Sequence, residues 1–256
     1  MDYFTSSYGI LRNTQIPKLF SVASLRKLPR NVDTQVTPDD VVIGWGFKPN
    51  TERARNVALD NKALYVALED GFIGWLNHPT QSKSSDRLSY VLDQQGIYYN
   101  SFKPSGIDAC LDALEGFDQK RCQNLKAQLS KLGLSKYNQA RQPSPRWLDR
   151  LSSSHDLNVL LLIDQTYGDA SIEYSGGSEK SFDDMLDWAA EKLREDTNSC
   201  LVIKTHPDVV LGKKEGYLIS ALTEAFKAEF RNRVHVLTQD VAPKDLISLA
   251  SEVAVV

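Results

Sequence analysis

Cysteine is scarce in this sequence, and the three cysteines that occur are far apart. Cys110, Cys122 and Cys200 form no CxxC pair, and their number is odd. A disulfide framework or a zinc-thiolate site is therefore not expected, and free thiols in a reducing compartment are. The four histidines show no metal-ligand spacing either, so we expect no metal site.

Long apolar runs and an excess of basic residues are also missing. No stretch approaches the roughly 20 apolar residues that cross a bilayer, and the N-terminus lacks the pattern of a secretory signal. We therefore expect a cytoplasmic protein, with peripheral contact at the inner face of the membrane left open. The formal net charge of −3 argues against a general nucleic-acid binder.

Three common nucleotide-binding and catalytic motifs are absent as well. The sequence contains no GxSxG, no GxxxxGK[ST] and no GxGxxG. Serine-hydrolase, P-loop and nicotinamide-binding interpretations therefore lose their main support.

What the sequence does contain is an alternation of short apolar runs with longer amphipathic stretches. The runs predict strands at 41–43, 63–68, 97–99, 159–163, 200–203, 234–237 and 253–256. The stretches predict helices at 51–60, 85–95, 118–132, 182–194 and 217–230, and a short one that begins at Pro243. This alternation is typical of an α/β protein whose parallel sheets are covered on both faces.

The composition changes between residues 135 and 154, where prolines, serines and charged residues cluster. We interpret this segment as a linker. It divides the chain into two Rossmann-like, doubly wound domains, 1–140 and 141–256, which we expect to face each other across a cleft. A parallel strand normally leads into a crossover helix, and nothing follows the last apolar run. Either this run is an edge strand or the chain has been cut; we favour the second interpretation and expect an incomplete C-terminal domain.

Polar or glycine-rich clusters follow four of the predicted strands. They are 44–49, 69–71, 164–169 and 204–208. Ligands of open α/β sheets bind beyond the carboxyl ends of the strands, so four clusters at such ends predict a binding site.

Each cluster also has a purely structural interpretation. Asp70-Gly71 is a common turn dipeptide, Asp164 could cap the next segment, Gly168 could supply a positive φ, and His206 could start a helix. Two adjacent carboxylates at the end of a buried strand are less ordinary, because their repulsion favours a group that can accept a proton.

Positive charge gathers at a different cluster. Lys204 and His206 bring N–H donors to a place where a phosphate could bind.

The motifs together resemble the bacterial capsule-polysaccharide Kdo transferases of the KpsC type. The resemblance rests on an ordered set of stretches: 45–49 with Ala54-Arg55, 68–73, 164–172, 204–209, 212–214 and 216–218. It covers roughly residues 41 to 250 and is most similar to the first of the two transferase modules that such proteins carry. It implies a GT-B-like pair of domains, an N-terminal acceptor side and a C-terminal domain that binds a CMP-sugar.

The resemblance also implies a function. The expected activity is an inverting transfer of Kdo from CMP-Kdo, with no cofactor, to a lipid-linked Kdo acceptor in capsule biosynthesis and export. The expected partners are therefore the CMP-sugar, the lipid-linked saccharide, a downstream transferase module and the capsule export machinery, and no nucleic acid.

The same resemblance implies roles for individual residues. Asp70, next to Glu69, is the expected general base, and His206 is the expected ligand of the donor phosphate. The expected donor-binding residues are Lys204, His206, Pro207, Asp164, Gln165, Gly168 and Asp169, and those on the acceptor side are Trp45, Gly46, Lys48 and Gly71.

Two departures from the family pattern keep other functions open. Gly74 and Trp75 stand where the family usually has arginine and serine, and the chain ends at Val256 before a hydroxyl-bearing turn that helps to hold the donor. A non-catalytic capsule assembly or export factor that keeps the fold is the main alternative. An enzyme that uses another CMP-sugar, such as a sialyltransferase-like one, is a further alternative.

Overall fold

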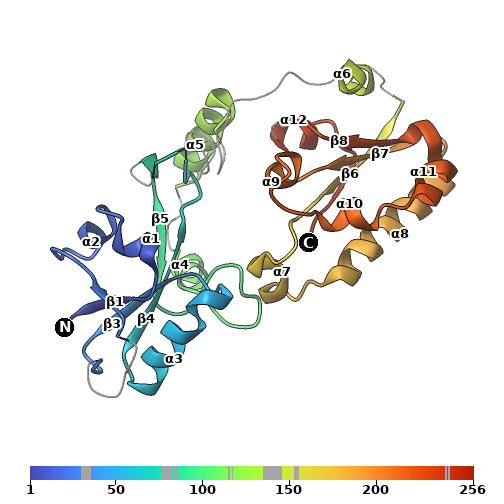
Figure 1. The fold of residues 1–256 in the computed structure, drawn as a ribbon. Coiled ribbons are helices and arrows are strands. Elements are labelled where there is room, and N and C mark those ends of the chain that lie inside the picture. Colours follow the sequence, from blue (N-terminus) through green and yellow to red (C-terminus); the bar gives the residue numbers. More distant parts are fainter. Residues whose placement is uncertain are drawn as a thin grey trace. The chain divides into compact units, whose positions relative to one another are not determined.

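The computed structural model of the chain describes residues 1–29, 36–75, 82–83, 86–114, 116, 118–134, 146–152, 156–239, 241 and 243–256. The chain divides into two compact units, Met1–Ala140 and Arg141–Val256, each with its own sheet and its own core. Each unit is described by itself below (Figure 1).

The N-terminal unit is built on a five-stranded sheet in the order β2-β1-β3-β4-β5. Its strands are β1 (Tyr3–Thr5), β2 (Arg26–Lys27), β3 (Val41–Trp45), β4 (Leu64–Asp70) and β5 (Tyr90–Asp93). The first four run parallel, whereas β5 is antiparallel to β4. The order departs from the chain order because β1 lies between β2 and β3.

Helices cover both faces of this sheet, as the alternating side chains of β3 require. The helices of the unit are α1 (Tyr8–Leu11), α2 (Ile16–Leu19), the short 3-10 helix η1 (Pro49–Thr51), α3 (Glu52–Asp60), α4 (Gly106–Asp112) and α5 (Gln119–Leu132). Val42 packs on one face with Val57 of α3, and Ile43 packs on the other face with Ile10 and Ile16.

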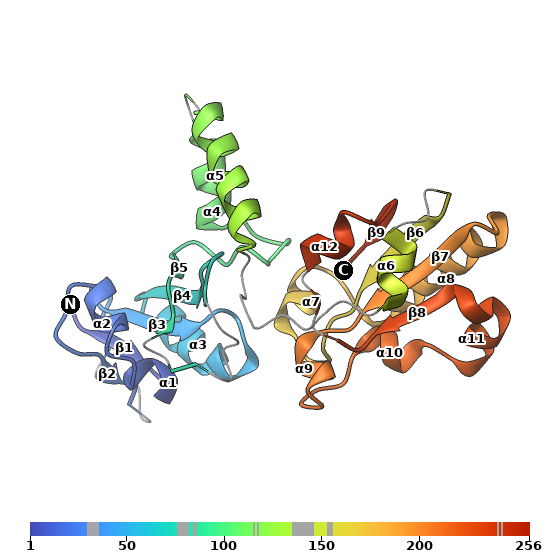
Figure 2. The ribbon, with the colours of Figure 1, turned by 90° about the horizontal axis from the view of Figure 1, so that it is seen from above.

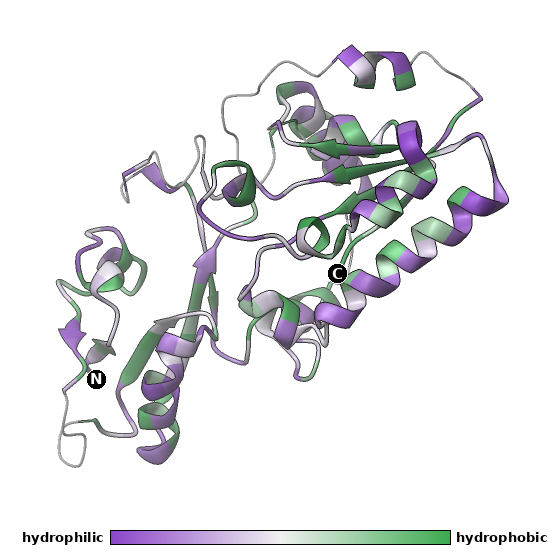
Figure 3. Ribbon diagram, turned by 45° about the vertical axis from the view of Figure 1, so that its right-hand side comes forward, coloured by the Kyte–Doolittle hydropathy of each residue, from purple (hydrophilic) through white to green (hydrophobic). Residues whose placement is uncertain are grey.

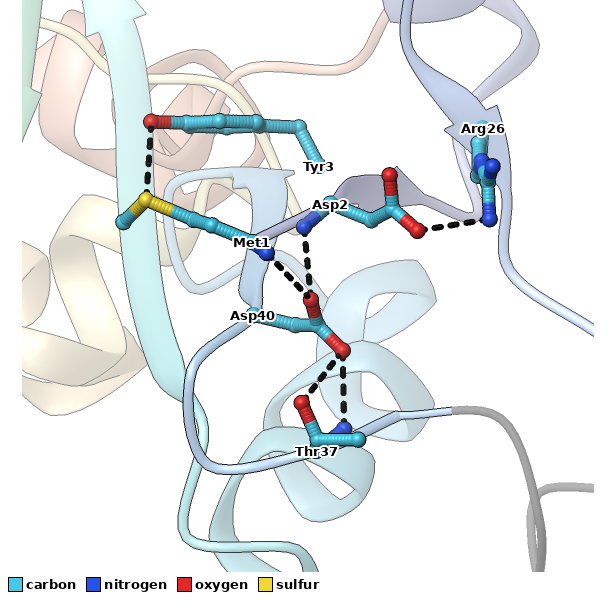
Figure 4. A network of polar contacts seen from close by, with 6 residues as sticks. All are labelled: Met1, Asp2, Tyr3, Arg26, Thr37 and Asp40. Atoms are coloured by element: carbon cyan, nitrogen blue, oxygen red, sulfur yellow. Dashed lines mark hydrogen bonds and ion pairs between the residues drawn. The ribbon is translucent and has the colours of Figure 1, made fainter.

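A buried carboxylate holds the first strand in place. Asp40 Oδ1 accepts the backbone N–H of Asp2 at 2.6 Å, and Oδ2 accepts the backbone and hydroxyl donors of Thr37, each at 2.9 Å (Figure 4). The amino group of Met1 lies 3.9 Å from Oδ1. Burial by itself raises the pKa of Asp40, but these contacts outweigh it and bring that pKa below its usual value.

The C-terminal unit has a fully parallel sheet in the order β8-β7-β6-β9. Its strands are β6 (Asn158–Ile163), β7 (Ser199–Lys204), β8 (Val234–Leu237) and β9 (Glu252–Ala254). Its helices are α6 (Arg146–Ser152), α7 (Ala170–Tyr174), α8 (Glu179–Glu195), α9 (Pro207–Val210), α10 (Tyr217–Ala221), α11 (Glu224–Phe230), the 3-10 helix η4 (Arg231–Arg233) and α12 (Pro243–Ile247).

The apolar strands β6 and β7 carry buried side chains on both of their faces. Leu160 and Leu162 join α8, α10 and α11 on one side, whereas Leu161 joins α6 and α12 on the other. Figure 3 shows these strands as strongly hydrophobic and α8 as mixed, with its hydrophilic positions interleaved along the helix. The predicted α/β class with parallel sheets covered on both faces is therefore confirmed.

Several predicted elements are wrong. Residues 90–93, placed in a helix at 85–95, form strand β5, because the edge of β4 offers unpaired backbone groups and tertiary pairing overrides a short local pattern. Residues 97–99 form a turn that is closed by a 2.9 Å hydrogen bond from Asn100 N–H to Ile97 O, and not a strand.

Two other predictions need correction in part. The helix predicted at 217–230 is two helices, because Thr223 Oγ1 accepts the N–H of Phe226 at 3.1 Å and starts α11. Within the predicted linker, 146–152 is helix α6, and residues 135–145 and 153–154 lie outside the described part. None of the described helices is long and apolar enough to cross a membrane.

Candidate functional site

Strands β3 and β4 end side by side in the N-terminal unit and bring two of the predicted clusters together. Trp45 pairs with Leu68, so the next residues, Gly46 and Glu69, are neighbours. Gly46 has a φ of +47°, and a Cβ there would lie 2.2 Å from the Tyr99 hydroxyl and 2.6 Å from Glu69 Oε1. Only glycine fits this backbone conformation and this space, so Gly46 lets Glu69 and Tyr99 close over the turn.

Glu69 and Asp70 do not form the repelling pair that we expected. They are consecutive residues of β4, and successive side chains of a strand point to opposite faces of the sheet. Glu69 lies on the side of Gly46 and Tyr99, whereas Asp70 contacts Trp75 and Arg87. The argument that mutual repulsion prepares one of them as a base is therefore wrong.

Asp70 is held by a cation instead. Arg87 Nε lies 2.6 Å from Asp70 Oδ1, and Trp75 Nε1–H donates to Asp70 Oδ2 at 3.1 Å. The alignment of the Arg87 contact falls outside that of a hydrogen bond, so we describe it as an ion pair. The two side chains are only 13% (Arg87) and 16% (Asp70) exposed, so water screens their attraction weakly.

Three aromatic rings surround the guanidinium of Arg87. Its Cζ atom lies 4.4 Å from the ring centroid of Trp45, 4.6 Å from that of Trp75 and 5.0 Å from that of Tyr90. These distances are within the range of cation–π attraction. Backbone pairing of Arg87 with Trp75 brings this part of the chain to the end of β4.

Sequence reasoning missed Arg87, because the residue lies in the segment that was predicted to be a helix. The remaining residues predicted on the acceptor side have different surroundings. Trp45 is one wall of the aromatic cage that Trp45, Trp75 and Tyr90 form around Arg87. Lys48 is exposed before η1. Gly71 is buried, and a Cβ there would lie 2.0 Å from Ser89 Oγ. Gly71 therefore allows close packing, which does not by itself indicate a ligand.

Strands β6 and β7 end together in the C-terminal unit and bring the other two clusters to one edge. Asp164 N–H donates to Lys204 O at 2.9 Å just beyond the paired residues Ile163 and Lys204. Asp164 itself is 1% exposed, and its Oδ1 accepts the N–H groups of Gln165 at 2.9 Å and Leu218 at 2.8 Å. Its carboxylate thus anchors α10 to the end of β6.

Burial dominates the ionisation of Asp164. Desolvation raises the pKa of its carboxyl, and the hydrogen bonds from Leu218 and Gln165 oppose that shift only in part. A Cβ on Gly216 would lie 2.1 Å from Asp164 Oδ2, so the chain passes directly over the carboxylate there. This placement supports the structural interpretation of Asp164, as an internal cap.

His206 caps α9 and has a defined tautomer when it is neutral. Its Nδ1 accepts the backbone N–H of Asp208 at 3.1 Å, so the hydrogen of a neutral imidazole is on Nε2. Burial lowers the pKa of His206, with Asp208 and Asp169 opposing this shift and Lys214 and Lys204 adding to it. The half-buried ring is thus a neutral N–H donor at pH 7.

The other predicted donor-side residues surround His206 or support its loop. Lys204 is 4% exposed at the end of β7, and Pro207 begins α9. Asp169 caps α7 by accepting Ser171 N–H at 2.9 Å, and Gly168 before it has a φ of +72°. Gln165 takes part through its backbone, since its carbonyl accepts Tyr217 N–H at 3.1 Å.

The two halves of the predicted site lie in different units. Asp70 belongs to Met1–Ala140 and His206 to Arg141–Val256, so their meeting across one cleft stays a prediction. No group of three or more potential metal ligands occurs among the described residues. Independence from metals and cofactors also stays a prediction.

These features define an α/β protein whose polar side chains gather at the carboxyl ends of parallel strands. The sequence profile of the capsule polysaccharide biosynthesis protein family matches residues 40–256, and the chain belongs to that family. The resemblance to capsule-polysaccharide proteins that the sequence motifs indicated is thereby confirmed.

Known proteins with similar sequences are capsule proteins of Neisseria meningitidis. Two proteins called capsule polysaccharide modification protein LipA, from a serogroup A and a serogroup B strain, are each 30% identical to this chain. Each match covers 95% of this chain and 34% of the relative. The chain therefore spans about a third of the length of these relatives.

Solved structures with the same fold come from Thermosulfurimonas dismutans. Its KpsC β-Kdo 2,4 transferase matches 99% of this chain and 73% of its own, with a TM-score of 0.80 and 27% identity. Its KpsC β-Kdo 2,7 transferase matches with a TM-score of 0.61 and 22% identity, over 99% of this chain and 71% of its own, which shows the fold alone. The predicted GT-B-like fold class is confirmed by the first match.

Proposed function

We propose that this chain is a glycosyltransferase module that transfers Kdo from CMP-Kdo to a lipid-linked saccharide in capsule polysaccharide biosynthesis. The observation that carries the proposal is the likeness over 99% of the chain to a β-Kdo transferase, together with family membership. Polar residues at the strand ends of both units support it, because sugar-nucleotide sites of α/β folds lie there. A downstream transferase module and the capsule export machinery are the proposed partners.

The proposed donor side depends on His206. Its Nε2–H donates to a phosphate oxygen of CMP-Kdo, because Nδ1 is already occupied by Asp208 N–H. As the bond to the sugar breaks, negative charge builds up on that phosphate, and a fixed donor stabilises it more strongly than it stabilises the ground state. Lys204 adds positive charge within electrostatic reach of the ring.

The proposed acceptor side depends on Asp70. Its carboxylate takes the proton of the acceptor hydroxyl as that oxygen forms a bond to the anomeric carbon. The bond from this carbon to the phosphate oxygen breaks, and CMP leaves with the electron pair. A carboxylate has about four acceptor positions, so the contacts with Arg87 and Trp75 leave room for the hydroxyl proton. This single displacement inverts the anomeric configuration.

The test measures CMP release from CMP-Kdo in the presence of a Kdo-bearing acceptor. We expect Asp70→Asn to reduce turnover by about 10²–10⁴, which is the usual contribution of a general base. His206→Gln should reduce turnover by a similar factor, because it removes an imidazole donor from the leaving group. Asp60→Asn, on the exposed end of α3, makes the same chemical change away from the strand ends and should retain full turnover. An Asp70→Asn variant with unchanged turnover refutes the base assignment.

Two further measurements separate the alternatives. NMR of the new glycosidic bond should show inversion relative to the donor; retention would mean that a carboxylate attacks the anomeric carbon itself. Calorimetry with CMP then distinguishes an enzyme from a non-catalytic capsule factor. A chain that lacks turnover with every acceptor and does not bind CMP contradicts the proposed donor site.

A further inference from the structure

Helix α5 is not part of either core of its unit. None of its fourteen residues is buried, and none belongs to a core cluster of the described residues. Leu125 is 51% exposed and Leu132 is 68% exposed. Figure 2 shows α5 as a rod that projects away from the sheet of its own unit. The core of this unit therefore does not cover the apolar side chains of α5.

Those apolar side chains form one stripe along the helix. Cys122, Leu125, Leu129 and Leu132 are spaced by three or four residues, which places them on one face at 3.6 residues per turn. Leu125 and Leu132 are exposed, whereas Cys122 and Leu129 are half-buried. Leu111 and Leu114, which precede the helix in the chain, are exposed as well. An apolar surface of this kind on a protein usually marks a binding surface.

The charges of α5 all have one sign. The helix carries Lys120, Arg121, Lys126 and Lys131 and contains no acidic residue, although the whole chain has a net charge of −3. By the same helical geometry, Arg121 and Lys126 lie at the two edges of the apolar stripe. Lys120 and Lys131 lie on the opposite side of the helix. The only acidic group at the helix is its N-cap, Asp118.

We propose that α5 docks this protein on an anionic lipid surface. The apolar stripe enters the boundary between headgroups and acyl chains, and Arg121 and Lys126 reach the lipid phosphates from its edges. A helix of this length, about 21 Å, is too short to span a bilayer but suits a position in the interface plane. Charge complementarity favours this occupant over a neutral protein partner, which has no need for a cation at each edge of the stripe.

The docking surface also deepens the proposed function, on which this point rests. An acceptor that is anchored by a lipid stays at the membrane, so a transferase without a contact there would meet it only rarely. A helix in the N-terminal unit would hold the expected acceptor side near that surface. Binding to lipid itself requires no catalytic activity and can be measured separately.

The experiment is sedimentation of the whole chain with vesicles. Vesicles of phosphatidylcholine with phosphatidylglycerol as about a third of the lipid should bind the chain, and pure phosphatidylcholine vesicles should bind it far more weakly. Arg121→Gln with Lys126→Gln should weaken binding about 30-fold, and Leu125→Gln with Leu132→Gln at least tenfold. Added salt should weaken binding, because the lipid phosphates are then screened.

Lys120→Gln with Lys131→Gln is the matched control. It removes the same charge from the same helix on the side away from the lipid, and should cost only about threefold, because these charges lie roughly one helix diameter farther from the lipid. Equal losses in the two charge variants would show attraction without docking and overturn the proposal. So would equal binding to both kinds of vesicle, or a dimer in sedimentation that the leucine variant dissociates.

A final comparison separates this proposal from the catalytic one. CMP release with a lipid-free acceptor saccharide should be the same in the α5 variants and in the unaltered chain. If vesicle binding follows the predictions but neither the unaltered chain nor any variant releases CMP, the catalytic proposal fails and the docking proposal stands.

Discussion

Replacing Arg87 with methionine tests the ion pair at the end of β4. The substitution keeps much of the apolar stem but leaves Asp70, only 16% exposed, with a single hydrogen bond from Trp75. Removing one partner of a buried pair costs about 3–5 kcal/mol. Because some water reaches this pair, we expect the free energy of unfolding to fall by about 3 kcal/mol. Loss of the cation from between three rings contributes to that value.

The second partner should behave differently. Asp70→Asn leaves the guanidinium among the three rings and keeps an oxygen for Trp75 Nε1–H, so we expect a smaller loss of about 1–2 kcal/mol. The double variant removes both charges at once and should be less unstable than the sum of the two single changes. A coupling energy of about 2 kcal/mol is expected for such a contact.

Urea unfolding followed by tryptophan fluorescence measures these differences. Replacing Trp147 and Trp188 by phenylalanine in every variant leaves Trp45 and Trp75, both of which touch Arg87, as reporters of the N-terminal unit. Arg26→Met, which breaks an exposed ion pair with Asp2 in the same unit, is the control and should cost less than 1 kcal/mol. A similarly small loss for Arg87→Met, or strict additivity in the double variant, would refute this account of the cage.

Two further predictions concern stability at other positions. The depressed pKa of Asp40 means that its contribution is complete above about pH 4, the usual aspartate value, and is lost as pH falls through the lower folded-state pKa. Asp40→Asn should therefore cost about 1–3 kcal/mol near neutral pH. It should also make the urea midpoint depend less on pH between about pH 5 and pH 2. If the midpoint of this variant falls with pH as steeply as that of the unaltered chain, the role given to Asp40 is wrong. Gly216→Ala should cost about 2–3 kcal/mol, because its Cβ would lie 2.1 Å from Asp164 Oδ2, whereas Gly168→Ala meets no neighbour within 4 Å and should cost about 1 kcal/mol for its positive φ. Equal thermal shifts in the two glycine variants would show that the contact with the carboxylate is unimportant.

Much of the fold follows from local patterns that the sequence displays. The strands β3, β6 and β7 are largely continuous apolar runs. The sequence also marks both ends of α5, with Asp118 as N-cap and Gly133, in the left-handed region, after the last turn. Such signals need no knowledge of distant contacts. The positions of the four polar clusters could also be predicted, because each cluster adjoins the carboxyl end of a strand that the apolar pattern had identified.

The errors occur where distant residues decide the conformation. Strand β5 forms because β4 offers it a partner, and the four residues 90–93 carry too little periodicity to show this. Arg87 was missed for the same reason. The position of Asp164 could not be predicted either, because the same residue after a strand can face a ligand or turn inward to cap α10, and only the packed structure distinguishes the two.

The place of β9 in its sheet has a consequence for synthesis of the chain. β9 pairs with β6, and contacts between these two regions join residues that are 92 positions apart. A nascent chain leaving the ribosome therefore completes β6, β7 and β8 while one edge of β6 still has unpaired backbone groups. Open strand edges attract other strands, and closing so long a loop is slow. We therefore expect the C-terminal unit to be most prone to aggregation in the interval before residues 252–254 have been made.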